Sequence, residues 1–253
     1  MKKYFLFCLF ALFTLCAAAQ IENEHIVARK DSFPSRQEMM KRARQNYGSW
    51  MISAGGGYAR WIAVIPKGTD PILKKYYDHL FWGFNPYLSG TYFLKFGLGF
   101  GLQYNGYFSS SKLNDVATIE INNKRYTGYV SEKISMQFFG GGIQYRLIKK
   151  TGASFLNFGV GFAYFVFNDN LKIESSTQSN HNIKFNGQSL GAQIHASYNY
   201  RIDPHFSIGL GIAINNGVLN SVNVNDGQYS YRDTSVHGSL IHIGLNAKLT
   251  IIL

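Results

Sequence analysis

Residues 157–167 read NFGVGFAYFVF, and taking every second position divides this stretch into two unlike sets. One set is bulky and apolar: Phe158, Val160, Phe162, Tyr164 and Val166. The other set is small or polar: Asn157, Gly159, Gly161 and Ala163. Successive side chains of a β-strand point to opposite sides of the sheet. This period of two therefore predicts a strand with one apolar face and one face that is nearly empty.

The same alternation recurs along the chain in eight runs. We predict strands at about 50–61, 81–94, 95–110, 133–147, 154–168, 187–202, 205–217 and 236–253. Short connections at 94–95, 148–154 and 203–204 alternate with long polar ones at 62–80, 111–132, 169–186 and 218–235. An even number of strands with short turns at one end and long loops at the other is typical of a membrane barrel. The predicted fold class is all-β, an eight-stranded antiparallel up-and-down transmembrane β-barrel.

The two faces of these strands predict which side chains meet lipid. In a membrane barrel the bulky face points outward and the small and polar face lines a narrow lumen. The alternative is a soluble, lipocalin-like barrel, which is apolar inside. The face opposite the aromatic residues favours the membrane barrel, because in 187–202 it carries Gln193, His195 and Arg201. The predicted lumen-facing polar residues are Gln103, Asn105, Gln144, Asn157, Gln193, His195, Asn199, Asn215, His242 and Asn246.

The first residues have the composition of a secretory signal peptide. Two lysines follow Met1, an apolar run leads to Ala19, and three alanines precede Gln20. A spanning helix needs about 20 apolar residues, and this run is shorter, so we favour a signal peptide over a membrane anchor, with cleavage after Ala19. Cleavage would remove both cysteines, Cys8 and Cys16. The mature chain would then contain no disulfide.

Residues 20–48 precede the first predicted strand. Ser35 and Glu38 have the spacing of a capping box, and Gly48 suits a helix end. We therefore predict three parts: the signal peptide at 1–19, a periplasmic arm with a short amphipathic helix at 20–48, and the barrel at 49–253. The arm could lie on the membrane surface, tuck under the barrel mouth or remain flexible.

Four cations are predicted near the periplasmic mouth. The alternation of the strands turns Arg146, Arg201 and Lys248 inward near one rim of the barrel. Lys95 lies at the same rim, at the start of its strand. These side chains could extend into water, or the mouth could receive an anion or an acidic segment. The chain as a whole has a formal charge of +11. No basic cluster is interleaved with stacking aromatic residues, so we expect no nucleic-acid partner.

Two stretches carry a resemblance to a known family. Residues 90–104, GTYFLKFGLGFGLQY, read as strand, turn and strand, and residues 242–249, HIGLNAKL, read as a C-terminal strand with spaced apolar residues. Both resemble the small, porin-like eight-stranded outer-membrane β-barrels of Gram-negative bacteria, the type that forms the OmpA transmembrane domain. The resemblance covers about 50–253. It implies an integral protein of the outer membrane.

One pair of residues invites a catalytic interpretation. His195 and Ser197 have the spacing of the His-x-Ser pair of outer-membrane lipid A deacylases. Both are predicted to face the lumen in the periplasmic half, and no Asp or Glu on the next strand could orient the histidine. We therefore expect no catalytic residue, and no motif indicates a cofactor or a metal.

The sequence leaves several roles open. The first is a non-enzymatic structural or interaction protein that acts through its extracellular loops. The others are a narrow channel for small solutes or apolar molecules, a component of a secretion or assembly machinery and, last, a lipid A-modifying enzyme. We expect a monomer in contact with outer-membrane lipid, with other envelope proteins as possible partners.

Overall fold

The computed structural model describes residues 49–63, 65, 69–121, 124–149, 152–174, 180–225, 230–233 and 238–253. These residues belong to one compact unit, Arg36–Leu253. The predicted signal peptide with its cleavage site, both cysteines and the predicted arm at 20–48 lie outside the described residues. Those expectations stay predictions.

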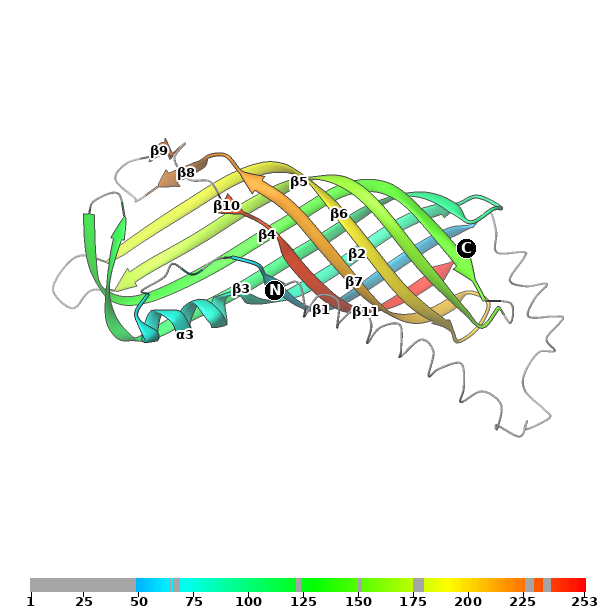
Figure 1. Ribbon diagram of the computed structural model, residues 1–253, viewed down its shortest axis with the longest axis horizontal. Coiled ribbons are helices and arrows are strands. Elements are labelled where there is room, and N and C mark those ends of the chain that lie inside the picture. The colour runs from blue at the N-terminus through cyan, green and yellow to red at the C-terminus, as the bar shows by residue number, and fades with distance from the viewer. Residues whose placement is uncertain are drawn as a thin grey trace, which may run out of the picture. The chain divides into compact units, whose positions relative to one another are not determined.

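Eight long strands form a closed wall (Figure 1). They are β1 (Trp50–Trp61), β2 (Trp82–Phe93), β3 (Leu98–Ile121), β4 (Lys124–Ile148), β5 (Ser154–Glu174), β6 (His181–Arg201), β7 (Phe206–Leu219) and β11 (His242–Ile252). Each pairs antiparallel with its neighbours, and β11 closes the ring by pairing with both β7 and β1. The predicted eight-stranded antiparallel up-and-down barrel is confirmed.

Three further strands are short and lie in the connection between β7 and β11. They are β8 (Val222–Asn225), β9 (Ser230–Asp233) and β10 (Gly238–Ser239). β8 pairs with the start of β6, where Phe185 lies opposite Val224. Part of this long polar connection therefore continues the wall.

Tight turns gather at one end of the barrel, which we call the short-turn end. Gly97 ends the turn after β2 with a φ of +91°, and a Cβ there would lie 2.7 Å from the carbonyl oxygen of Arg146. Asp203 Oδ1 accepts from the backbone N–H of His205 (2.7 Å), which tightens the turn after β6. The backbone N–H of Trp50 donates to the carbonyl of Leu253 at the same end. In Figure 1 the C-terminus marks this end, and the opposite end carries the long connections.

Two of the predicted loops are strands, so the predicted boundaries at 110, 133, 168 and 187 were wrong. β3 and β4 form one long hairpin, and β5 and β6 extend in the same way. In the last part of β5 the two faces exchange character: Lys172 is exposed, whereas Leu171 and Ile173 are buried. The outward face is largely apolar where lipid covers the wall and largely polar beyond it. A prediction that expects apolar residues on the outer face of every strand therefore does not recognise the part of each hairpin that extends beyond the lipid.

A helix, α3 (Pro71–Leu80), lies within the predicted loop at 62–80. Asp70 caps it, because its Oδ1 accepts from the N–H of Ile72 at 2.7 Å, and Pro71 occupies the first turn. Tyr76 and Leu80 are its buried residues. The cap and proline were visible in the sequence, but one amphipathic decapeptide does not reveal where it packs.

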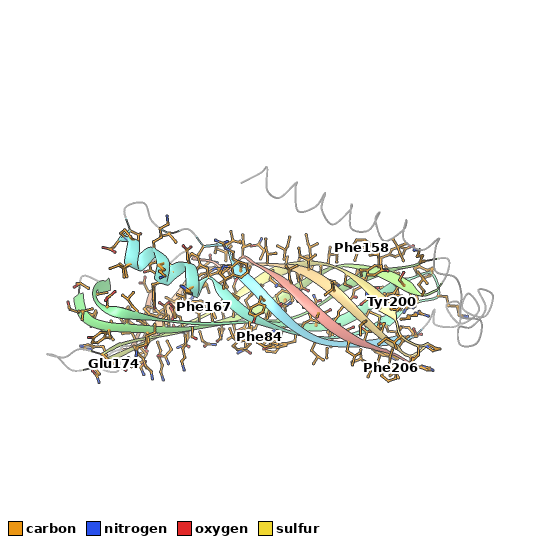
Figure 2. The ribbon with its side chains drawn as sticks, turned by 90° about the horizontal axis from the view of Figure 1, so that it is seen from below. Phe84, Phe158, Phe167, Glu174, Tyr200 and Phe206 are labelled. Atoms are coloured by element: carbon orange, nitrogen blue, oxygen red, sulfur yellow. The ribbon has the colours of Figure 1, made fainter. Side chains whose placement is uncertain are left out.

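The outer face of the wall is a broad apolar belt. Phe162 and Leu190 are each 82% exposed and Leu102 is 75% exposed. Figure 2 shows the side chains along the wall, with Phe84, Phe158, Tyr200 and Phe206 labelled; all four are exposed. The inner face is small where strands crowd: a Cβ at Gly161 would lie 2.9 Å from Gln103 Nε2. The alternation at 157–167 thus separates a lipid-type surface from a filled lumen.

Candidate functional site

The lumen is layered, and its first layer is an apolar floor at the short-turn end. The floor consists of Met51, Phe93, Phe155 and Ile252, each at most 2% exposed. Ile148 packs against it. Met51 and Ile252 are paired where β1 and β11 close the ring, which brings both chain ends of the barrel into one cluster.

Two arginines predicted for the basic rim lie inside the barrel against this floor. Arg146 is 1% exposed, and its Cζ lies 4.4 Å from the ring centroid of Phe93. The Cζ of Arg201 lies 5.5 Å from the ring centroid of Phe155. Aromatic faces attract such cations. The guanidinium groups are therefore held within the lumen rather than at a mouth open to water.

The other two predicted rim cations separate from each other. Lys248 is 7% exposed, and its Nζ donates to Ser197 Oγ at 2.7 Å and lies 5.5 Å from the ring centroid of Tyr87. Lys95 is exposed in the turn between β2 and β3. The structure thus brings three of the four cations into the lumen and leaves Lys95 outside it.

A hydrogen-bonded polar layer lies above the floor. Every side chain predicted to line the lumen with a polar group is inside the barrel, and none is more than 7% exposed. The bonds cross between strands: Gln144 Nε2 donates to Thr91 Oγ1 (2.8 Å), and Gln193 Nε2 donates to Asn215 Oδ1 (2.6 Å). Asn215 Nδ2 lies 2.9 Å from His242 Nε2. Buried polar groups need such partners.

The predicted set of lumen-facing polar residues does not include every member of this layer. Asn85 donates to Asn105 Oδ1 and accepts from Asn246 Nδ2 at 2.8 Å, so it joins β2, β3 and β11. The hydroxyls of Ser53 and Thr250 are 2.8 Å apart across the closing pair of strands. The period of two in β1, β2 and β11 would have placed these residues inward.

The geometry does not assemble the catalytic pair considered from the sequence. His195 is 7% exposed, and among the described residues neither of its ring nitrogens has a hydrogen-bond partner. Ser197 Oγ instead accepts from Lys248 Nζ and from Asn199 Nδ2 (3.2 Å). An activated serine needs a base bonded to its hydroxyl. This arrangement fits a structural part of the polar layer.

The third layer is an apolar plug toward the loop end, where a polar lining was expected. We refer to this layer as the plug; it includes the buried side chains Tyr107, Met136, Phe138, Phe165, Phe167 and Leu240. The rings of Phe138 and Phe165 meet edge to face with centroids 5.0 Å apart. The expectation was wrong here, because the inward face of β5 changes from glycine and alanine to phenylalanine after Ala163.

Helix α3 packs on this plug and covers two carboxyl groups. Tyr107 OH donates to the carbonyl of Leu80 at 2.6 Å, which fixes the end of the helix to β3. Tyr76 OH donates to Glu132 Oε2 at 2.7 Å. Asp169, on β5, is hydrogen-bonded to Glu132. All three groups lie beyond the apolar belt, because the outward neighbours Lys133 and Asn170 are polar.

The carboxyl pair holds a proton near neutral pH. Burial, followed by the charge and hydrogen bond of Glu132, raises the pKa of Asp169 to about 9. Burial also raises the pKa of Glu132. Burial and the nearby Glu132 raise the pKa of Tyr76, so its hydroxyl stays a donor. Two carboxyl groups in contact cannot both ionise at low cost. The sequence did not reveal this pair, because it depends on the register of the β4–β5 hairpin.

A groove of about 700 Å³ opens on the outer face of β5, β6 and β7. Its apolar walls include Phe162, Tyr164, Leu190 and Val218, and its polar lining includes Gln188, Ser189, Asn216 and Asn220. The β6–β7 ladder ends at the pair of Gly191 and Gly217. Beyond that pair Ser189 Oγ donates to the carbonyl of Val218 at 2.7 Å. The groove lies where the two strands diverge.

Neither a metal cluster nor a spanning helix is found among the described residues. In that part of the chain no group of three or more His, Cys, Asp or Glu side chains could hold a metal ion. No helix there is long and apolar enough to cross a membrane.

Comparisons with known proteins show the fold. No family model and no curated relative matches the chain. A major outer membrane protein from Thermus thermophilus is similar, with a TM-score of 0.52 at 11% identity, over 81% of this chain and 98% of that one. Neisserial surface protein A is similar with a TM-score of 0.41 at 13% identity (80% and 96% covered). The outer membrane protease OmpT from Escherichia coli has a TM-score of 0.45 at 9% identity (81% and 95% covered).

Proposed function

We propose that this chain, which has the fold of the small eight-stranded outer-membrane β-barrel proteins, is an integral protein of a Gram-negative outer membrane. In this proposal the signal peptide is cleaved after Ala19, and the mature protein is a monomer. Its role is non-enzymatic and is exerted by the β3–β4 and β5–β6 hairpins, which reach beyond the membrane.

The observation that carries the proposal is the apolar belt on a closed wall. On β5 the outward apolar residues run from Leu156 to Val166, which is the length of about 9–11 residues that a tilted spanning strand needs. Closure pairs the backbone groups of every belt strand with a neighbour, as hydrocarbon requires. A water-soluble barrel would not leave Phe162 and Leu190 four-fifths exposed.

The filled lumen supports a scaffold rather than a channel. Floor, polar layer and plug lie in series, and each contains side chains that are almost fully buried. A solute would have to displace Phe93 or Phe155 at one end and Phe138 or Phe165 at the other. The hairpins outside the belt have paired backbones and largely polar outer faces, which suits contact with other molecules.

Two measurements test the proposal. The purified full chain should stay in solution only with detergent, and after insertion into a planar bilayer it should give little or no current. A chain that is monomeric in water without detergent would refute the membrane assignment. Steady conductance would refute the closed-scaffold role and favour the narrow-channel alternative.

A further inference from the structure

Four lysines lie close together on the outer face of the extended hairpins. We refer to them as the lysine cluster: Lys112, Lys133, Lys172 and Lys184. They lie one on each of β3, β4, β5 and β6, and all four are exposed. Asn170 lies opposite both Lys133 and Lys184. Ser131 lies opposite both Lys112 and Lys172 in the same way. Lys133, Asn170 and Lys184 therefore form one row across β4, β5 and β6. Lys112, Ser131 and Lys172 form the next row, across β3, β4 and β5.

This spacing allows the four ammonium groups to converge. Two lysines of one row are separated by one strand, so their backbones are about 10 Å apart. The two rows are two residues apart along a strand, which is about 7 Å. A lysine side chain is flexible and ends in a compact charge with three donors. Two or three of these side chains can therefore contact one multivalent anion.

The acids nearby offset only part of the charge of the lysine cluster. Glu132 and Asp169 face inward and bond to Tyr76 and to each other. Where the side chains of these hairpins are described, the exposed acids are Asp115 and Glu174. Both lie farther from the belt than the lysine on the same strand. The side of the cluster that faces the membrane therefore stays positive.

On β4 and β6 the outer face between the belt and the lysine cluster is polar but neutral. Lys184 lies six positions from Leu190 on β6 and Lys133 lies six positions from Phe139 on β4, about 20 Å along a strand. On β3, Lys112 lies four positions from the exposed Phe108, about 13 Å along the strand. With a tilt of about 40° the lysines lie about 10–15 Å beyond the belt. The headgroup region is only about 5–8 Å thick on each side. Outward positions in this interval include Ser135, Gln137, Asn168, Asn186 and Gln188.

The groove begins at the upper edge of the belt on the same strands, β5 and β6. Its outer wall combines Phe162, Leu190 and Val218 with the amides of Gln188 and Asn216. Ala192, on the outward face of β6, is the small side chain of its lining. It suits an acyl chain that leads upward to a polar headgroup. From belt to hairpin the surface therefore presents a hydrophobic groove, then amides and hydroxyls, and then cations.

We propose that this surface binds a phosphorylated glycolipid of the outer leaflet, with an acyl chain in the groove, sugars along the amide-rich interval and phosphate on the lysine cluster. The inference rests on the proposed membrane location. The height of the lysines selects a lipid that carries its anions beyond a sugar layer. The phosphate of a simple phospholipid would lie nearer to the belt.

The charge part is tested with two matched triple variants of the full chain in detergent. K133Q/K172Q/K184Q removes three cluster lysines, and K74Q/K75Q/K149Q removes three exposed lysines from α3 and a short turn. Binding of phosphorylated lipopolysaccharide, and of the same glycolipid after removal of phosphate, is measured for each variant by native mass spectrometry. The cluster variant should lose at least about tenfold in affinity for the phosphorylated form only, and high salt should abolish the difference. Equal losses in both variants, or none, would overturn the proposal.

The groove part is tested by filling the hollow. A192W places a bulky ring in the groove, and L210W places the same ring on the exposed face of β7 outside it. A192W alone should weaken binding of the acylated glycolipid. If dextran sulfate binds through the lysine cluster and the glycolipid does not, the surface serves a soluble polyanion and the proposal fails. Folded variants that still require detergent would leave the membrane assignment intact.

Discussion

At the scale of residues, the carboxyl pair under α3 couples protonation to the outer end of the barrel. The pKa of Asp169 rises to about 9 in the folded protein, from an ordinary value near 3.8. The folded state therefore binds this proton more tightly than the unfolded chain does. The resulting stabilisation is complete below about pH 4 and is lost as the pH rises toward about 9. Tyr76 transmits this change to the helix, because its hydroxyl donates to Glu132.

The first prediction concerns this pH dependence. Between about pH 5 and pH 9 the outer end should lose stability progressively, seen as faster hydrogen exchange in α3 and the adjoining part of β4. Asp169→Asn keeps a neutral group at every pH and should flatten the profile. The exposed Asp78→Asn on α3 should leave the profile unchanged. An identical slope in Asp169→Asn would show that another group is responsible.

The second prediction concerns the polar layer. Asn85→Ala leaves groups of Asn105 and Asn246 without their partner in a buried site. It should lower the free energy of unfolding by about 1–3 kcal/mol, measured by urea denaturation in detergent. Thr118→Ala removes an exposed hydroxyl contact with Thr127 and should change stability by well under 1 kcal/mol. Equal effects would mean that the buried network adds little.

At the scale of elements, each hairpin divides into a part covered by lipid and a part covered by water. In the first part β5 turns Phe158 and Phe162 outward; in the second it turns Leu171 and Ile173 inward. The second part thus has a core of its own, to which α3 contributes Tyr76 and Leu80. The helix and the plug belong to one buried cluster.

The third prediction follows from this division. Replacing 71–80 by a flexible Gly-Ser linker removes the contacts of Leu80 and Tyr76 with the plug. The belt strands should still fold, as judged by the migration of unheated samples in a denaturing gel. Protease cleavage in the outer parts of β3 and β4 should increase. Loss of the folded band would show that α3 is required for the whole barrel.

At the scale of the whole molecule, two apolar layers separate the lumen from water at both ends. The floor uses Phe93 and Phe155, and the plug uses Phe138 and Phe165. The charges of Arg146 and Lys248 lie between them, inside the wall. Since the layers are in series, we expect either one alone to block ions.

The fourth prediction tests this series arrangement by conductance. Phe138→Ala/Phe165→Ala thins the plug and Phe93→Ala/Phe155→Ala thins the floor; each double variant should stay closed in a planar bilayer. The combined variant should leak, and the buried cations between the layers should make that leak favour anions. Gel migration confirms that each variant is folded. Current through a single double variant would show that one layer alone forms the barrier.

The sequence by itself determined the strands, their antiparallel order and the direction of their side chains within the belt. The alternation of Phe158 to Val166 with Asn157 to Ala163 reflects a local rule: neighbouring side chains face lipid and lumen in turn. The same rule placed Arg146, Asn215 and His242 inward.

Only the tertiary structure decided which inward groups meet and where lipid ends. Asn85 and Asn246 are 161 positions apart, and their bond depends on the ring closing in one register. Glu132 meets Asp169 because two strands continue past the belt, where the apolar face turns inward. Burial and contact between distant strands are properties of the closed wall, and no window of neighbouring residues contains them.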